Sequence, residues 1–230
     1  PNFSGTGSNA IRLADRVVGL KSFRGDLIVF CKNSIYKVIN LESADATTAV
    51  VPITKNIDCV DQFSIQEIGG DLVFLSPDGV RSVAGTARIG DVELGSVSRQ
   101  IQSVTSLIAR DIDDFTITSC VLRRRSQYRL YYSTAGGAID RAKGIIGTLT
   151  REGFEWSETQ GIQASAIVSD FSSAGVEKIF HGDKNGYVYN HDIGSSFTAL
   201  GTPFNIDAKY TTPFLDFGDV GTRKTMKYLK

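Results

Sequence analysis

Apolar residues occur in short runs along the chain, and most of these runs form pairs separated by a tight turn. At four places an apolar strand is followed by a Gly, Asn or Asp segment and then by a second strand. The four pairs are Asp26–Phe30 with Ile35–Val38, Asp71–Leu75 with Val80–Val83, Tyr128–Tyr132 with Gly144–Leu149, and Lys178–His181 with Tyr187–Tyr189. This pattern predicts four β-hairpins.

Two of these hairpins have turn sequences that demand a particular backbone. Asn185-Gly186 predicts a type I′ turn, in which both central residues adopt positive φ. Pro77-Asp78-Gly79 fixes φ at the first corner and supplies glycine where the chain reverses. We therefore expect Gly79 and Gly186 at positive φ, and Gly79, Asn185 and Gly186 to be critical for these turns.

The hairpins recur at a nearly regular distance. Taking Leu27, Leu72, Leu130 and Ile179 as equivalent positions, the spacings are 45, 58 and 49 residues. A further apolar strand precedes each hairpin, in Val17–Leu20, Phe63–Ile68, Phe115–Val121 and Ala164–Val168. Such periods predict an all-β fold, a β-propeller-like array of four-stranded antiparallel blades. An irregular β-sandwich is the alternative fold.

One stretch has helical instead of strand periodicity. Apolar positions between Val97 and Ala109 are spaced by three and four, with Ser96 or Ser98 available as N-cap. A short amphipathic helix is therefore expected between the second and third blades. We divide the chain into an extended lead-in over 1–16, about four visible blades over 17–200, and a strand segment over 201–230. The last segment is expected to lead into a missing part of a larger subunit, of which this chain is an excerpt or a processed product.

Composition and charge narrow the function classes. Hydrophobic residues make up 41% of the chain, and 25 basic residues balance 25 acidic ones. A net charge of zero argues against a dedicated nucleic-acid binder, although DNA could still pass through a neutral channel. The three cysteines, Cys31, Cys59 and Cys120, lie among apolar neighbours and are interpreted as buried thiols. No apolar run is long enough to predict a membrane span.

No catalytic constellation is found, so we expect no enzyme activity, no cofactor and no metal. The only histidines, His181 and His191, flank a hairpin, and a metal site would need further ligands. The Asp and Asn residues that could suggest calcium are explained by turn geometry; they are Asp183, Asn185, Asn190 and Asp192. The acidic cluster Asp111, Asp113 and Asp114 could serve acid–base chemistry but is better interpreted as a solvated loop.

The sharpest basic run is Arg123-Arg124-Arg125. If this run were a strand, Arg124 would point to one face and its two neighbours to the other. Two interpretations stay open: contact with a subunit boundary or the lumen of a conduit, or a solvent-facing strand end. Trp156 is expected to pack in a blade core or a blade interface.

Several of these segments resemble one known family. The stretch from Val17 to Phe30, followed by Asn33–Tyr36, resembles the opening blade of phage DNA-stabilisation and tail nozzle proteins. Asp71–Arg81 resembles the next blade, Phe180–Tyr189 is similar to another, and Ile206–Phe217 resembles the strand that continues the chain.

The resemblance implies a virion protein of short-tailed bacteriophages, assembled in the host cytoplasm. It would form a ring with copies of itself, a hexamer in this family, below the portal and its adaptor. Its function would be structural, as part of the conduit for genome retention and ejection, with DNA passing transiently. The alternative function is a propeller-type recognition module that binds glycan on a host surface.

Overall fold

The computed structural model describes residues 11–40, 48–84, 96–134, 142–199, 202–206 and 208–209. The chain divides into two compact units, residues 1–192 and 193–230. In the second unit, the described strands are β15 (Phe197–Ala199) and β16 (Thr202–Phe204), which form an antiparallel hairpin. Everything that follows concerns the first unit.

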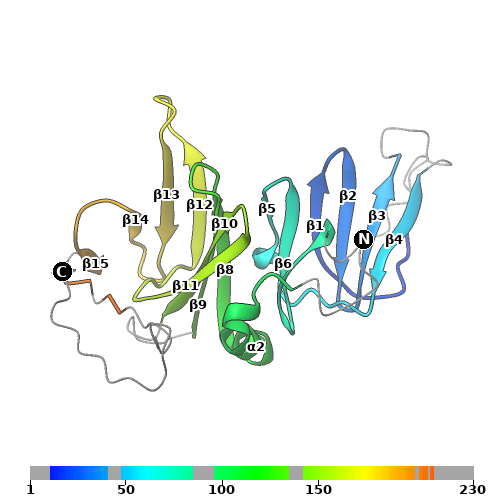
Figure 1. The fold of residues 1–230 in the computed structure, drawn as a ribbon, viewed down its shortest axis with the longest axis horizontal. Coiled ribbons are helices and arrows are strands. Elements are labelled where there is room, and N and C mark those ends of the chain that lie inside the picture. Colours follow the sequence, from blue (N-terminus) through cyan, green and yellow to red (C-terminus); the bar gives the residue numbers. More distant parts are fainter. Residues whose placement is uncertain are drawn as a thin grey trace, which may run out of the picture. The chain divides into compact units, whose positions relative to one another are not determined.

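The described strands of the first unit form four antiparallel sheets, here named A to D (Figure 1). Sheet A contains β1 (Val17–Phe23), β2 (Asp26–Cys31), β3 (Ser34–Ile39) and β4 (Ala49–Lys55). Sheet B contains β5 (Gln66–Ile68), β6 (Asp71–Ser76) and β7 (Gly79–Ser82), and is preceded by the 3₁₀ turn η2 (Gln62–Ser64). Sheet C contains β8 (Phe115–Leu122), β9 (Gln127–Thr134), β10 (Lys143–Thr150) and β11 (Gly153–Gln160). Sheet D contains β12 (Ala166–Phe171), β13 (Glu177–Gly182) and β14 (Val188–Asn190).

In each sheet the strands lie side by side in chain order. The predicted all-β, blade-like architecture is therefore confirmed. Sheets A and C have the expected four strands, whereas sheets B and D have three among the described residues. In sheet B, Ser96 forms an isolated bridge to Arg81 on the outer side of β7.

Strand β6 explains why the apolar runs are continuous instead of alternating. Leu72 and Phe74 belong to the core between sheets A and B, where the ring centroids of Phe30 and Phe74 lie 5.2 Å apart. Val73 and Leu75, which alternate with them, belong to the core between sheets B and C. A strand covered by a neighbouring sheet on each face needs apolar residues at every position.

The predicted helix is present, but its N-cap is not as expected. A 3₁₀ turn η4 (Arg99–Ile101) continues into α2 (Gln102–Arg110), which leads into η5 (Ile112–Asp114). Its buried residue Ile108 packs in the core between sheets B and C. Ser98 makes no side-chain cap hydrogen bond; its Oγ instead accepts the Val80 N–H at 2.8 Å. The fully buried hydroxyl satisfies a strand amide that would otherwise lack a partner.

The turn predictions are confirmed for the glycines and wrong for the turn type. Gly79 lies at φ 136° and Gly186 at φ 87°, but Asn185 does not adopt positive φ. The Asp183 carboxylate accepts the N–H groups of Asn185 and Tyr187, at 2.8 and 2.9 Å. This local acceptor favours a longer turn that needs only one left-handed residue.

Turns with two residues at positive φ occur elsewhere, at equivalent places in sheets A and B. Arg24 and Gly25 join β1 to β2 at φ 52° and 83°, and Gly69 and Gly70 join β5 to β6 at φ 61° and 75°. Both are two-residue loops, as the pairs that flank them show. Successive blades therefore repeat a turn geometry as well as a strand order.

Candidate functional site

The three arginines form a loop and not a strand, which corrects the alternating interpretation. The last pair of the β8–β9 ladder joins Leu122 to Gln127, so Arg123, Arg124 and Arg125 lie in the connection. Ser126 completes this loop at φ 50°. All three arginines are exposed.

This loop connects two strands of sheet C, and its residues also contact sheet D of the same chain. The Glu177 carboxylate accepts the backbone N–H groups of Arg123 and Arg124, at 2.8 and 2.9 Å. The Arg124 guanidinium lies 5.9 Å from the centre of the Phe171 ring. Arg125 donates to Asp192 at 2.9 Å. At least part of the basic run thus has a role inside the fold, and its contact with another subunit or a lumen stays a prediction.

Asp192 also holds a buried arginine that sequence reasoning missed. Arg129 donates to both carboxylate oxygens of Asp192, at 3.2 and 2.9 Å, and to Gln127 Oε1. Its side chain is 5% exposed. Burial raises the pKa of Asp192, but hydrogen bonds and charge from Arg129, with charge from Arg125, outweigh it and the pKa is lowered. The sequence signal that could have revealed this buried pair is a single arginine within an otherwise largely apolar strand.

The two histidines, separated by ten residues in the sequence, meet between sheets C and D. His181 Nδ1 lies 2.5 Å from His191 Nε2, and the rings are nearly perpendicular. His181 stacks on Tyr189, and the edge of His191 meets Tyr131. Burial lowers the pKa of His181, and burial together with the charges of His181 and Arg129 lowers the pKa of His191 to about 4.

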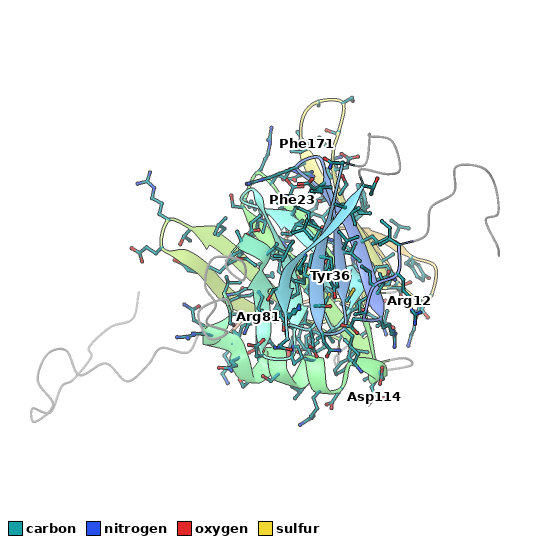
Figure 2. The ribbon with its side chains drawn as sticks, turned by 90° about the vertical axis from the view of Figure 1, so that its right-hand side faces the viewer. Arg12, Phe23, Tyr36, Arg81, Asp114 and Phe171 are labelled. Atoms are coloured by element: carbon teal, nitrogen blue, oxygen red, sulfur yellow. The ribbon has the colours of Figure 1, made fainter. Side chains whose placement is uncertain are left out.

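No cluster of three His, Cys, Asp or Glu suited to a metal occurs in the part of the chain that the structure describes. The two carboxylates among the candidate calcium ligands, Asp183 and Asp192, are engaged separately. Asp183 accepts two turn amides and the Tyr189 hydroxyl, whereas Asp192 accepts from arginine. Asp111 pairs with Arg110 at the end of α2. Asp113 and Asp114 are exposed, and Asp114 lies at the periphery in Figure 2.

The buried cysteines and Trp156 have packing roles. Cys31, Cys59 and Cys120 are free and buried, and burial raises the pKa values of Cys59 and Cys120 to about 12. A thiol with such a pKa remains protonated near neutrality and is a poor nucleophile. Trp156 meets Tyr128 edge-on and donates its Nε1–H to the Val97 carbonyl at 2.8 Å.

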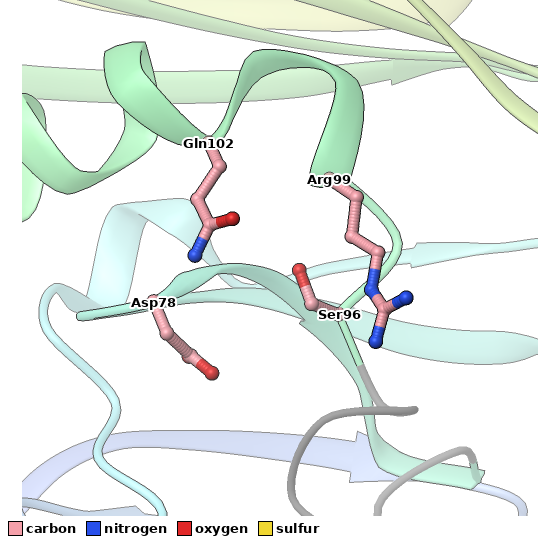
Figure 3. A pocket seen from close by; sticks show the side chains of 4 residues that line it. All are labelled: Asp78, Ser96, Arg99 and Gln102. Carbon is pink, nitrogen blue, oxygen red and sulfur yellow. The ribbon is translucent and has the colours of Figure 1, made fainter.

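A polar hollow of about 310 Å³ lies where the tip of the β6–β7 hairpin approaches α2. Asp78, Ser96, Arg99 and Gln102 line it, and Figure 3 shows their side chains around one opening. Arg81, which is 1% exposed, fixes Asp78 through a two-point pair. The hollow presents a carboxylate, a hydroxyl, a guanidinium and an amide, and so both donors and acceptors of hydrogen bonds.

Gly79 follows Asp78 in this hairpin, at a position that leaves no room for a side chain. A β-carbon on Gly79 would lie 2.5 Å from Ser98 Oγ and 2.9 Å from Ser96 Oγ. Glycine is thus required at position 79 for two reasons: the positive φ angle, and the two hydroxyl groups that leave no space for a β-carbon.

Comparison with known proteins gives no family assignment. No protein-family model matches the chain, and a search of curated proteins finds no match either. Among the described residues, no helix has the length and apolar character that crossing a membrane requires.

Proposed function

We propose that this chain is a structural module of the tail nozzle of a short-tailed bacteriophage, acting through assembly. The observation that carries the proposal is the stack of four small sheets, each packed face to face on the next in chain order. This is the propeller-like architecture that the resemblance of Val17–Phe30 and Phe180–Tyr189 to nozzle proteins implies.

Contacts between successive sheets suit a scaffold that must keep its shape. Arg24 donates to the Gly70 carbonyl, which ties sheet A to sheet B. Gln66 donates to the Ser119 carbonyl, which ties sheet B to sheet C. Ser169 donates to the Val121 carbonyl, which ties sheet C to sheet D. In each of these hydrogen bonds the acceptor is a backbone carbonyl, so the position of one blade is fixed relative to the backbone of the next.

The neutral charge of the chain also supports a conduit. Strong phosphate contacts would retain a genome that has to pass, because every neutralised phosphate adds affinity. The proposed partners are copies of the chain in a hexameric ring, the portal and adaptor, and DNA in transit within the virion. Subunit contacts would combine many modest polar and apolar contributions.

The test is charge reversal of the arginine loop. Arg123→Glu/Arg124→Glu/Arg125→Glu should impair ring formation or genome release, measured by imaging purified particles and assaying their infectivity. Because Arg124 and Arg125 also contact sheet D, the variant must first show the unfolding midpoint of a control, Arg151→Glu, which reverses the charge of an exposed arginine in the turn between β10 and β11. A folded triple variant with normal tails and infectivity would remove the arginine loop from the proposal. A soluble monomer that turns over a substrate would contradict the proposed structural function.

A recognition module for host-surface glycan is the second candidate, and the polar hollow favours it. Hydroxyl-rich ligands need a mixture of donors and acceptors such as Asp78, Arg99 and Gln102 provide. A glycan array read with the parent chain and with Arg99→Ala/Gln102→Ala tests this function. Sugar binding by a monomer or trimer, lost in the double variant, would replace the nozzle proposal; a ring of defined stoichiometry without sugar binding would exclude the glycan function.

A further inference from the structure

The histidine pair lies where sheet D rests on sheet C, the least apolar of the contacts between successive sheets. His181 belongs to β13, and His191 follows β14 directly. The backbone N–H of His191 donates to the Ile179 carbonyl at 2.9 Å, which fixes the second ring beside the first. Three buried apolar residues form the core of this contact, Cys120, Leu122 and Ile179.

The short distance between the ring nitrogens has one consequence for protonation. A neutral imidazole carries one N–H donor and one acceptor nitrogen, so two neutral rings can share a single hydrogen bond. When both rings are protonated, each facing nitrogen carries a hydrogen and the bond cannot form. The contact between His181 Nδ1 and His191 Nε2 therefore requires at least one neutral ring.

The charged groups around the histidine pair do not offset the positive charge that a second proton would add. From sheet C, Arg129 opposes positive charge on His191, and Tyr131 and Cys120 are buried weak acids that stay neutral. Within sheet D and its hairpin, Asp183 favours a charged His181, but its oxygens accept two amides and the Tyr189 hydroxyl. Asp192 likewise favours a charged His191, but it is already paired with Arg129 and Arg125, and Glu177 is engaged by the arginine loop.

We infer that the His181–His191 pair is a proton-sensitive latch, which holds sheet D on sheet C near neutral pH and releases it in mild acid. This inference does not depend on the proposed function. The latch acts on sheet D alone, because the cores between sheets A, B and C are apolar and contain no histidine among the described residues.

The direction of the effect follows from the lowered pKa values. Folding favours the neutral rings, so their contribution is complete above the unfolded pKa of about 6.5 and is lost as pH falls toward the folded pKa. The opened form takes up protons that the closed form excludes. For His191 alone, with a folded pKa of about 4, the opening equilibrium of sheet D should rise about 30-fold between pH 8 and pH 5.

Hydrogen exchange of the full chain, followed by mass spectrometry at pH 7.5 and pH 5.0, tests the latch. After correction for the intrinsic exchange rates, peptides covering β12–β14 should lose protection at pH 5.0, whereas β6 and β9 should keep theirs. The matched variant is His181→Asn/His191→Gln, since these amides place polar atoms near the positions of Nδ1 and Nε2 without titrating. We expect it to remove most of the pH dependence.

Three results would overturn the inference. If the double variant loses as much hydrogen-exchange protection in β12–β14 at pH 5.0 as the parent does, other groups cause the opening. If ZnCl₂ protects β12–β14 of the parent more than tenfold over a sample with chelator, the pair is a metal site instead. Should the variant fail to fold, the imidazole ¹⁵N signals of the parent decide: normal titration near pH 6.5 without opening of sheet D would also contradict the latch.

Discussion

The two faces of sheet C come from the same strands yet contact their neighbours by different means. On β9, Tyr128, Leu130 and Tyr132 point toward sheet B and join a core of twelve buried apolar residues. Arg129 and Tyr131 alternate with them and point toward sheet D. The contact on this side is largely polar: it includes the Arg129–Asp192 ion pair, the Glu177 carboxylate that accepts amides of the arginine loop, and the two histidines.

This difference separates a permanent contact from a conditional one. Apolar burial depends little on pH, because it rests on removing uncharged surface from water. Ion pairs and buried imidazoles depend on protonation, since their contribution changes with charge. A single β-strand can therefore provide a fixed interface on one side and an adjustable one on the other.

The strongest test of the fixed side is Leu130→Ala. Leu130 is fully buried, and removing a buried leucine side chain leaves a cavity that costs about 3 kcal/mol of unfolding free energy. Urea denaturation should show the loss with fluorescence and circular dichroism alike, because the core between sheets B and C would be affected as a whole. An unchanged midpoint would mean that this face does not stabilise the unit.

Gly79→Ala should have the next largest effect, about 2 kcal/mol. The methyl group would be strained at φ 136° and would meet two serine hydroxyls, one of which is held by Val80. Gly186→Ala is the control, because it combines a positive φ with open space and should cost about 1 kcal/mol. Thermal unfolding of both variants measures the difference; equal losses would show that the packed hydroxyls contribute nothing.

On the conditional side, Asp192→Asn should cost about 1–2 kcal/mol and should act on sheet D. It leaves the buried Arg129 guanidinium without its charged partner, although Asp192 itself is a third exposed and water moderates the loss. Because the pKa of Asp192 is lowered, its stabilisation is present above the unfolded pKa of about 3.9 and is lost as pH falls below it.

Parent and Asp192→Asn should thus differ at pH 7 and differ less at pH 3, by chemical denaturation at both pH values. Asp26→Asn, which breaks the more exposed pair with Lys37, should change stability by less than about 0.5 kcal/mol. A difference between parent and Asp192→Asn that persists unchanged at pH 3 would contradict the ion-pair explanation.

Trp156→Phe should have the smallest effect, about 1 kcal/mol. It keeps an aromatic ring near Tyr128 but removes the hydrogen bond from Nε1 to the Val97 carbonyl. Hydrogen exchange of η4 and α2 is the sensitive measurement, since Val97 lies two residues before η4. Unaltered protection there would show that the bond does not anchor the helical insertion.

The sequence by itself determined the all-β class, the repeated hairpins and the helical insertion. These features follow from local patterns, namely runs of apolar residues, turn glycines at Gly79 and Gly186, and a three-to-four spacing after Val97. The continuous apolar run Leu72–Leu75 is also a local pattern, and the structure shows its reason, since a neighbouring sheet covers each face of this strand.

Only the tertiary structure decided which polar residues meet. Arg129 and Asp192 are 63 residues apart, and Glu177 reaches the arginine loop from the next blade. The N-cap expected at Ser98 is absent for the same reason, since the distant Val80 amide donates to its hydroxyl. The turn at Asn185 differs from the expected type for a local reason, since Asp183, two residues earlier, accepts its amide. Hydrogen-bond partners are chosen by distance in the folded chain, whereas apolar and turn patterns are encoded locally along the sequence.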